Sequence, residues 1–92
     1  MKPPEPSPYH VRLHFAEPEA LVSGERVFDI ALQGQLRIEG FDICRDSGAA
    51  KRGLVREFRD VPVADALVIE LRKSTPRSAD PVLSGVELIA AE

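Results

Sequence analysis

The fold class follows from the stretch Tyr9-His10-Val11-Arg12-Leu13-His14-Phe15, in which apolar and polar side chains alternate. Successive side chains of a β-strand point to opposite faces of its sheet, so this alternation would place the apolar side chains on one face. A period of two is typical of a strand that is buried on one face and solvated on the other. We therefore predict a half-buried strand over residues 9–15.

Outward from this stretch, five further segments have the composition of strands and lie between turn residues. They cover residues 26–32, 35–43, 54–61, 66–72 and 83–90. One turn of helix is expected at residues 46–52, with Asp46 or Ser47 as its N-cap and Gly53 as its stop. Six short strands separated by turn residues predict an all-β sandwich of about six strands.

The apolar positions of these strands define the expected core. Leu67, Ile69 and Leu71 are spaced by two, so one strand would direct all three side chains to the same face. The side chains that we expect to be mostly buried are Val11, Leu13, Phe15, Phe28, Ile30, Leu67, Ile69, Leu71 and Val86.

The hairpin turn at Gln33-Gly34 leaves two registers open. A two-residue loop suits the turn preference of glycine, but a regular ladder then places Ile30 opposite Arg37. A three-residue loop pairs Ile30 with Ile38 and so keeps the apolar side chains on one face. Turn chemistry and apolar pattern therefore favour different registers.

The size and charge of the chain exclude several classes of function. The chain has 92 residues, of which 12 are basic and 15 acidic, and its formal net charge is −3. This length suits a single domain with a small core, and a binding or structural module is expected rather than an enzyme. Nucleic acid is not expected as a partner, because its binding proteins usually carry a basic excess. A membrane is not expected either, because no apolar run approaches the roughly 20 residues of a spanning helix.

The first eight residues differ in composition from the rest of the chain. Four of the eight prolines lie in residues 1–8, which we expect to form an extended, unpaired tail or linker before a domain of residues 9–92. These prolines stand where a signal peptide would need an apolar segment, so no signal peptide is recognised. Cys44 is the single cysteine, and we expect it to pack as a small apolar residue without a disulfide.

Residues that could carry chemistry form no recognisable catalytic or metal site. His10 and His14 would share one strand face at a separation of about 13 Å, which is too far for one metal ion. Ser47 lacks the G-x-S-x-G surroundings of a nucleophile elbow, and residues 48–53 lack the G-K-[ST] ending of a phosphate-binding loop. We therefore expect no metal, no cofactor and no catalytic residue.

Charged residues bracket the loop of residues 18–25, at the ends of two predicted strands. They are Arg12, Glu17, Arg26 and Asp29. We expect ion pairs among them to hold the base of the loop, in a structural rather than a ligand-binding role. An ordinary exposed ion pair of this kind contributes about 0–1 kcal/mol to stability.

A series of segments in a fixed order carries a family resemblance. They are Tyr9-His10-Val11-Arg12-Leu13-His14-Phe15-Ala16-Glu17, Gly24-Glu25-Arg26-Val27-Phe28-Asp29-Ile30, Leu32-Gln33-Gly34-Gln35-Leu36, Phe41-Asp42-Ile43 and Leu83-Ser84-Gly85-Val86-Glu87-Leu88. In this order they resemble the signature of malectin and malectin-like domains, with Gln33 where the family's hairpin has asparagine. The first segment is the most specific, and the resemblance spans about residues 9–91.

The resemblance implies a jelly-roll-like β-sandwich that binds carbohydrate without catalysing a reaction. In the family an acidic sugar contact lies just before a proline in the loop that precedes the last strand. Asp80-Pro81 stands close to that place, so Asp80 is the one residue carried over as a carbohydrate contact. Bacterial members are usually modules of larger envelope or secreted proteins, which implies an extracellular or periplasmic location if this chain is part of an exported protein.

Departures from the family pattern point to a second function. The family places an aromatic pair in the segment that reads Pro18-Glu19-Ala20 here, so rings that could stack on a sugar are missing. Family members are also longer on the N-terminal side. We therefore expect the chain to form a homo-oligomer or to take up a partner segment that supplies the missing strands. The alternative function is a structural or protein-interaction β-sandwich module that has lost the sugar site.

Overall fold

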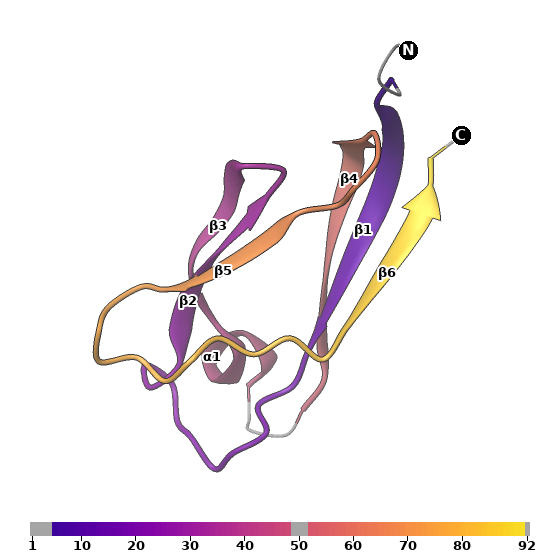
Figure 1. Cartoon of the computed structure of the whole chain (residues 1–92). Coiled ribbons are helices and arrows are strands. Elements are labelled where there is room, and N and C mark those ends of the chain that lie inside the picture. The colour runs from indigo at the N-terminus through magenta and orange to yellow at the C-terminus, as the bar shows by residue number, and fades with distance from the viewer. Residues whose placement is uncertain (1–4, 49–51, 92) are drawn as a thin grey trace.

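Two antiparallel sheets, each of three strands, form the structure, a computed structural model that describes residues 5–48 and 52–91. The elements in chain order are β1 (Ser7–Phe15), β2 (Val27–Leu32), β3 (Gln35–Asp42), α1 (Ile43–Ser47), β4 (Leu54–Val63), β5 (Ile69–Lys73) and β6 (Gly85–Ala90). One sheet has the order β4-β1-β6 and the other the order β3-β2-β5. The two sheets lie side by side in Figure 1, with α1 near their lower ends. The predicted all-β, jelly-roll-like sandwich is thus confirmed.

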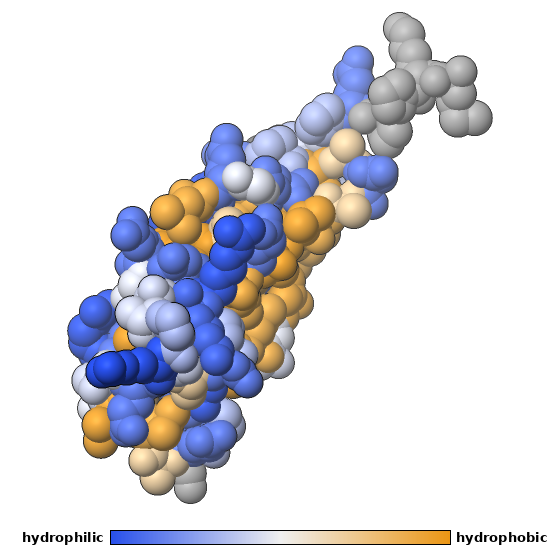
Figure 2. Space-filling view, turned by 60° about the vertical axis from the view of Figure 1, so that its left-hand side comes forward, coloured by the Kyte–Doolittle hydropathy of each residue, from blue (hydrophilic) through white to orange (hydrophobic). Residues whose placement is uncertain are grey.

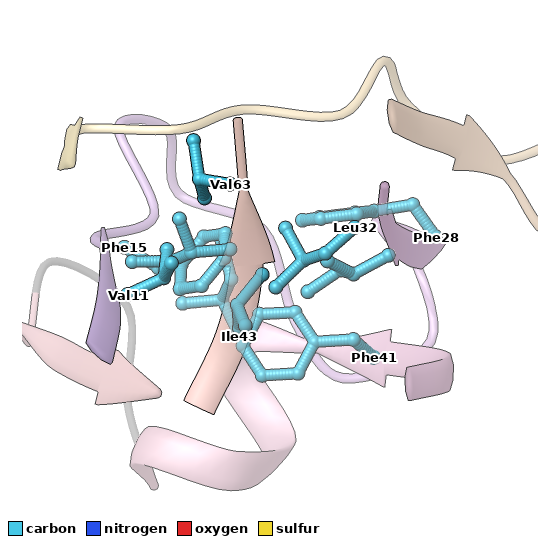
Figure 3. Packing of buried hydrophobic residues seen from close by; sticks show 10 residues of the cluster. Val11, Phe15, Phe28, Leu32, Phe41, Ile43 and Val63 are labelled. Atoms are coloured by element: carbon cyan, nitrogen blue, oxygen red, sulfur yellow. The ribbon is translucent and has the colours of Figure 1, made fainter. Parts of the chain in front are cut away.

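The core lies between the central strands of the two sheets. Phe15 of β1, Phe28 of β2 and Phe41 of β3 are fully buried, with ring centroids 4.6 to 6.0 Å apart. Their tilted and edge-on arrangement is the one that aromatic rings prefer. Aliphatic side chains from both sheets and from α1 surround the three rings, among them Val11, Leu32, Ile43 and Val63 (Figure 3).

The core prediction is right for the central strands β1 and β2 and wrong for the later segments, where β5 and β6 are both edge strands. Val11, Leu13, Phe15, Phe28 and Ile30 are buried as expected. Leu67, Ile69 and Leu71 are only half-buried, and Val86 is 44% exposed. Val86 does point to the inner face, because it lies opposite the buried Leu13 on β1. However, β6 is at the edge of its sheet, and the second sheet leaves its inner face uncovered.

The hairpin between β2 and β3 combines the two registers that the sequence left open. Gln33 and Gly34 form a two-residue turn with φ angles of 52° and 78°, the positive values that a tight hairpin turn requires. The ladder shifts by one residue between Ala31 and Ile30, so Ile30 nevertheless lies opposite Ile38. A β-bulge of this kind accommodates one extra residue and so satisfies both the turn and the apolar pattern.

The helix lies earlier in the chain than predicted. It covers Ile43–Ser47 instead of residues 46–52, of which 49–51 are outside the described residues. Its N-cap is Asp42, whose carboxylate accepts a hydrogen bond from the Arg45 N–H at 3.2 Å. The N–H of Gly48, at a φ of 87°, closes the helix by donating to the Cys44 carbonyl at 3.0 Å. The sequence does not indicate Asp42 as the cap, because its apolar pattern extends the predicted strand to residue 43.

The first strand begins at Ser7, two residues before its predicted start. Ser7 and Pro8 lie opposite Val63 and Pro62 of β4, so this end of the expected unpaired tail belongs to the sheet. Pro8 has no N–H to donate, but its carbonyl accepts a hydrogen bond from the Ala91 N–H at 3.0 Å. A proline near the start of a strand is therefore tolerated here. Residues 1–4 of the predicted tail lie outside the described residues.

Candidate functional site

A buried ion pair lies at the base of the loop between β1 and β2. Glu17 follows the end of β1 by two residues, and Arg26 directly precedes β2. The Arg26 Nε donates to Glu17 Oε1 at 2.7 Å, and its Nη2 donates to Glu17 Oε2 at 3.0 Å. The side chains of Arg26 and Glu17 are 5% and 0% exposed. The hydrogen bond to Glu17 raises the pKa of Arg26 above its ordinary value, so the guanidinium keeps its charge although it is buried.

The third nitrogen of Arg26 reaches the segment that precedes β6. Its Nη1 donates to the main-chain carbonyl of Asp80. Two neighbouring contacts tie the same segment to the start of β2: the Val27 N–H donates to Ser78 Oγ at 2.9 Å, and the Ala79 N–H donates to the Glu25 carbonyl at 2.9 Å. Arg26 thus fixes the backbone of Asp80, which is 54 residues away in the chain.

An open hollow of about 530 Å³ lies directly over this junction. Its lining residues come from the loop after β1, the start of β2, the end of β5 and the segment before β6; they are Pro18, Glu19, Arg26, Lys73, Ser78, Ala79, Asp80 and Val82. The Asp80 side chain is 85% exposed, and its Oδ1 lies 3.0 Å from Lys73 Nζ. The Glu19 carboxylate, 66% exposed, lies 3.8 Å from Arg26 Nη2. The hollow therefore presents two carboxylates and one ammonium group to solvent.

The structure brings Glu17, Arg26 and Asp80 together but places the other predicted residues elsewhere. Arg12 lies on the outer face of β1, where its Nε donates to Glu57 Oε1 at 3.1 Å. The Asp29 carboxylate accepts from the Gly40 N–H and the Ser74 hydroxyl, both at 2.9 Å. The prediction that these four charges gather at the loop base is therefore wrong for Arg12 and Asp29. Arg12 precedes the loop and Asp29 follows it, each by several residues. The side chains of both point to the outer faces of their sheets instead.

The burial of the Glu17–Arg26 pair also differs from expectation. We expected an ordinary exposed pair, whereas both side chains are almost completely enclosed. Residues 78–80 contribute to this cover on the Arg26 side, because the Asp80 carbonyl accepts from Arg26 and Ser78 Oγ accepts from the Val27 N–H. Lys73 and Ser78 were not identified from the sequence, since no local pattern links them to the loop.

The two histidines lie apart from the hollow, on β1. His14 Nε2 lies 2.6 Å from Glu87 Oε1, and His10 Nδ1 accepts from the Asp60 N–H at 3.4 Å. Within residues 5–48 and 52–91, no three His, Cys, Asp or Glu side chains gather as a metal site would require. No helix in the same ranges is long and apolar enough to cross a membrane.

A second, smaller hollow of about 280 Å³ lies on the outer face of the sheet β3-β2-β5. Its lining residues are Asp29, Ala31, Gly34, Leu36, Glu70 and Arg72. Arg72 pairs with Glu70 at 2.7 Å, and the Asp29 carboxylate already accepts the two hydrogen bonds described above. Its charged groups are thus already hydrogen-bonded, and the family resemblance places no contact residue here, so the hollow beside Asp80 is the stronger candidate.

Comparison with known proteins gives one family and two relatives. A family model described as the malectin domain matches residues 2–83. Two probable receptor-like protein kinases of Arabidopsis thaliana are each 35% identical to the chain, over 92 and 85 aligned residues. These alignments cover 88% and 87% of this chain but 10% of each relative, so the chain spans about a tenth of the length of these kinases. No solved structure matches the chain significantly.

Proposed function

The chain belongs to the malectin domain family, and we propose that it acts as a non-catalytic carbohydrate-binding module. The observation that carries this proposal is the hollow beside Asp80, the residue to which the family resemblance assigns a sugar contact. The hollow has a volume of about 530 Å³, and ligand pockets commonly occupy about 300–1,000 Å³. It lies at the end of the sandwich where the loop after β1 meets the segment before β6.

The exposed groups in the hollow have the chemistry that sugar hydroxyls require. The carboxylates of Asp80 and Glu19 accept hydrogen bonds from hydroxyl groups, and the Lys73 ammonium donates them. Arg26 fixes the main chain of Asp80 without using its carboxylate. The carboxylate is thus held on an ordered backbone while it stays accessible, which lowers the entropic cost of binding.

The electrostatic surroundings support a binding role rather than catalysis. Both oxygens of Glu17 accept hydrogen bonds from Arg26, and the Asp80 carboxylate lies beside Lys73. A general acid needs instead a carboxyl group whose proton is retained by apolar surroundings or by a second carboxylate. Neither carboxylate has such surroundings, because each one contacts a cation.

A second candidate function is a structural or protein-interaction module that has lost the sugar site. The observation that favours it is the composition of the hollow, because none of its lining residues is aromatic. Sugar sites commonly place an aromatic ring against the apolar face of the pyranose. The uncovered edge of β6 also favours an association with a second chain, whether another copy or a partner segment.

We further propose an extracellular or periplasmic location, as part of a larger exported protein. The support is that the two plant relatives are probable receptor-like protein kinases, of which the matched region is about a tenth. A module that binds carbohydrate would meet its ligand outside the cytoplasmic membrane.

Titration of the ¹⁵N-labelled chain with maltose and other glucose disaccharides tests the proposal. We expect saturable shifts of amide signals at Lys73, Ser78, Ala79 and Asp80. Asp80→Ala should weaken binding about tenfold or more, because it removes the carboxylate but leaves the carbonyl that Arg26 binds. Asp65→Ala, an exposed acidic residue on the β4–β5 connection, is the matched control. Signals that stay unchanged with every disaccharide, and no binding on a glycan array, would favour the second function.

A further inference from the structure

The last strand, β6, has one hydrogen-bonding edge that no other described strand occupies. It pairs with β1 on one side only. Three of its apolar side chains are strongly exposed: Val86 at 44%, Leu88 at 46% and Ile89 at 42%. Hydrophobic side chains also form a strip along the long axis of the molecule in Figure 2. An uncovered edge with apolar side chains is a template for pairing with another strand.

The other three sheet edges carry features that discourage such pairing. β4 contains Pro62 together with Arg56, Glu57, Arg59 and Asp60. The β2–β3 ladder has two register shifts that distort β3, and β5 carries Glu70, Arg72 and Lys73 among its five residues. Prolines, charges and bulges are the means by which proteins protect their strand edges. By contrast, β6 has a single charged residue, Glu87.

The free peptide groups of β6 belong to its apolar inner-face residues. The Ala91 N–H donates to the Pro8 carbonyl of β1, and hydrogen-bonded positions alternate along an antiparallel ladder. The N–H and C=O groups of Val86, Leu88 and Ala90 therefore point away from β1, toward the free edge. Val86 and Leu88 lie opposite the buried Leu13 and Val11, so their side chains lie on the inner face.

We propose that β6 pairs antiparallel with the β6 strand of a second copy of this chain, about a two-fold axis at Leu88. Each Leu88 then lies opposite Leu88 of the other copy, and each Val86 lies opposite Ala90. The peptide groups that face the edge meet one another, and the inner faces of the two copies join into one sheet. Such a two-fold contact is closed, so association stops at a dimer.

The charge pattern of β6 favours an axis at Leu88 over an axis at Glu87. An axis at Glu87 would place two carboxylates directly opposite each other, which is destabilising. With the axis at Leu88, Glu87 lies opposite Ile89 of the second copy and remains available to His14 of its own chain. A register displaced by one residue would pair inner-face with outer-face side chains. With the axis at Leu88, the strand is therefore complementary to itself.

Charge substitutions at Leu88 test the proposal on the full chain. We expect a dimer mass for the unmodified chain in sedimentation equilibrium. Leu88→Lys and Leu88→Glu should each give monomers, because like charges then meet at the axis. An equimolar mixture of the two variants should recover the dimer, since opposite charges now face each other. The same pair of changes at Leu36, which is 58% exposed on β3, should leave the dimer mass unchanged.

Crosslinking provides a test that does not depend on the folding of the charged variants. Directly opposite hydrogen-bonded residues have Cα atoms about 5.5 Å apart, a separation that a disulfide can span. In a Cys44→Ala background, Leu88→Cys should form an intermolecular disulfide on mild oxidation, and Ile89→Cys should not. A monomeric unmodified chain at high micromolar concentration, a mixture that stays monomeric, or equal crosslinking at both positions would overturn the proposal.

Discussion

Glu17 accepts two hydrogen bonds from Arg26, and this buried pair closes the base of the loop between β1 and β2. The third nitrogen of the guanidinium binds the Asp80 carbonyl, so one side chain joins the loop, the start of β2 and the segment before β6. Arginine suits this role because its planar group presents several donors in fixed directions. The pair thus builds the floor of the hollow that we propose as the sugar site.

Removal of one partner of this pair should destabilise the domain strongly. Glu17→Gln leaves the buried Arg26 charge without its counter-ion, and such changes cost about 3–5 kcal/mol. Arg26→Lys should also be destabilising, since an ammonium group cannot reproduce the three contacts. The measurement is the free energy of unfolding from urea denaturation.

The matched control for the buried pair is Glu70→Gln on β5. Its partner Arg72 is 77% exposed, so the loss should stay at about 1 kcal/mol or less. Equal losses at Glu17 and Glu70 would contradict the buried assignment.

The burial difference between strands can be measured with one substitution at two sites. Leu13→Ala removes a fully buried side chain and should cost about 2–5 kcal/mol, because it leaves a cavity between the sheets. Leu36→Ala, at 58% exposure, should cost about 1 kcal/mol or less. Phe28→Ala should cost about 3–5 kcal/mol. Thermal or urea midpoints that do not separate Leu13 from Leu36 would contradict the described packing.

The backbone at Gly40 requires glycine. Its φ of 69° lies in the left-handed region, and its N–H donates to Asp29 where the β2–β3 ladder shifts a second time. A Cβ at this position would meet no atom within 4 Å, so conformation alone sets the cost of Gly40→Ala, about 1–2 kcal/mol. Gly53→Ala has equal space and no positive φ, and should be neutral or slightly stabilising. The same stability for both variants would argue against the bulge.

The Cys44 thiol should react slowly in the folded chain. Its side chain is buried, and burial raises the pKa of the thiol above its ordinary value, so little thiolate is present at neutral pH. We expect modification by a disulfide reagent to be slow in buffer and fast in denaturant at the same pH. A rate in buffer equal to that of the unfolded chain would show that Cys44 is accessible.

The pKa of Glu57 offers a pH-dependent readout on the outer face of β1 and β4. Hydrogen bonds from Arg59 and from Arg12 lower this pKa below its ordinary value. Ionised Glu57 is therefore favoured by folding, so its contribution is complete above the ordinary pKa and is lost as the pH falls through the lowered pKa. In an NMR titration, Arg59→Gln should raise the pKa of Glu57, whereas Arg72→Gln on the other sheet should not.

The strands themselves were determined by the sequence, because the alternation in residues 9–15 or 26–32 reflects a local geometric rule. The family was readable for the same reason, since its signature segments are short and continuous. The sequence also located Asp80, Glu17 and Arg26, but it did not indicate that Arg26 would bind the Asp80 carbonyl.

Only the tertiary structure decided which faces are covered and which charges meet. Val86 has the alternation of a core residue, yet it is exposed because β6 lies at a sheet edge. Glu17 and Arg26 look like a surface pair in the sequence, yet both are buried, and Arg26 binds the distant Asp80 carbonyl. Local periodicity states where a side chain points relative to its own strand, whereas burial depends on what the rest of the chain places opposite. Burial is therefore set by the packing of the two sheets, which no local pattern encodes.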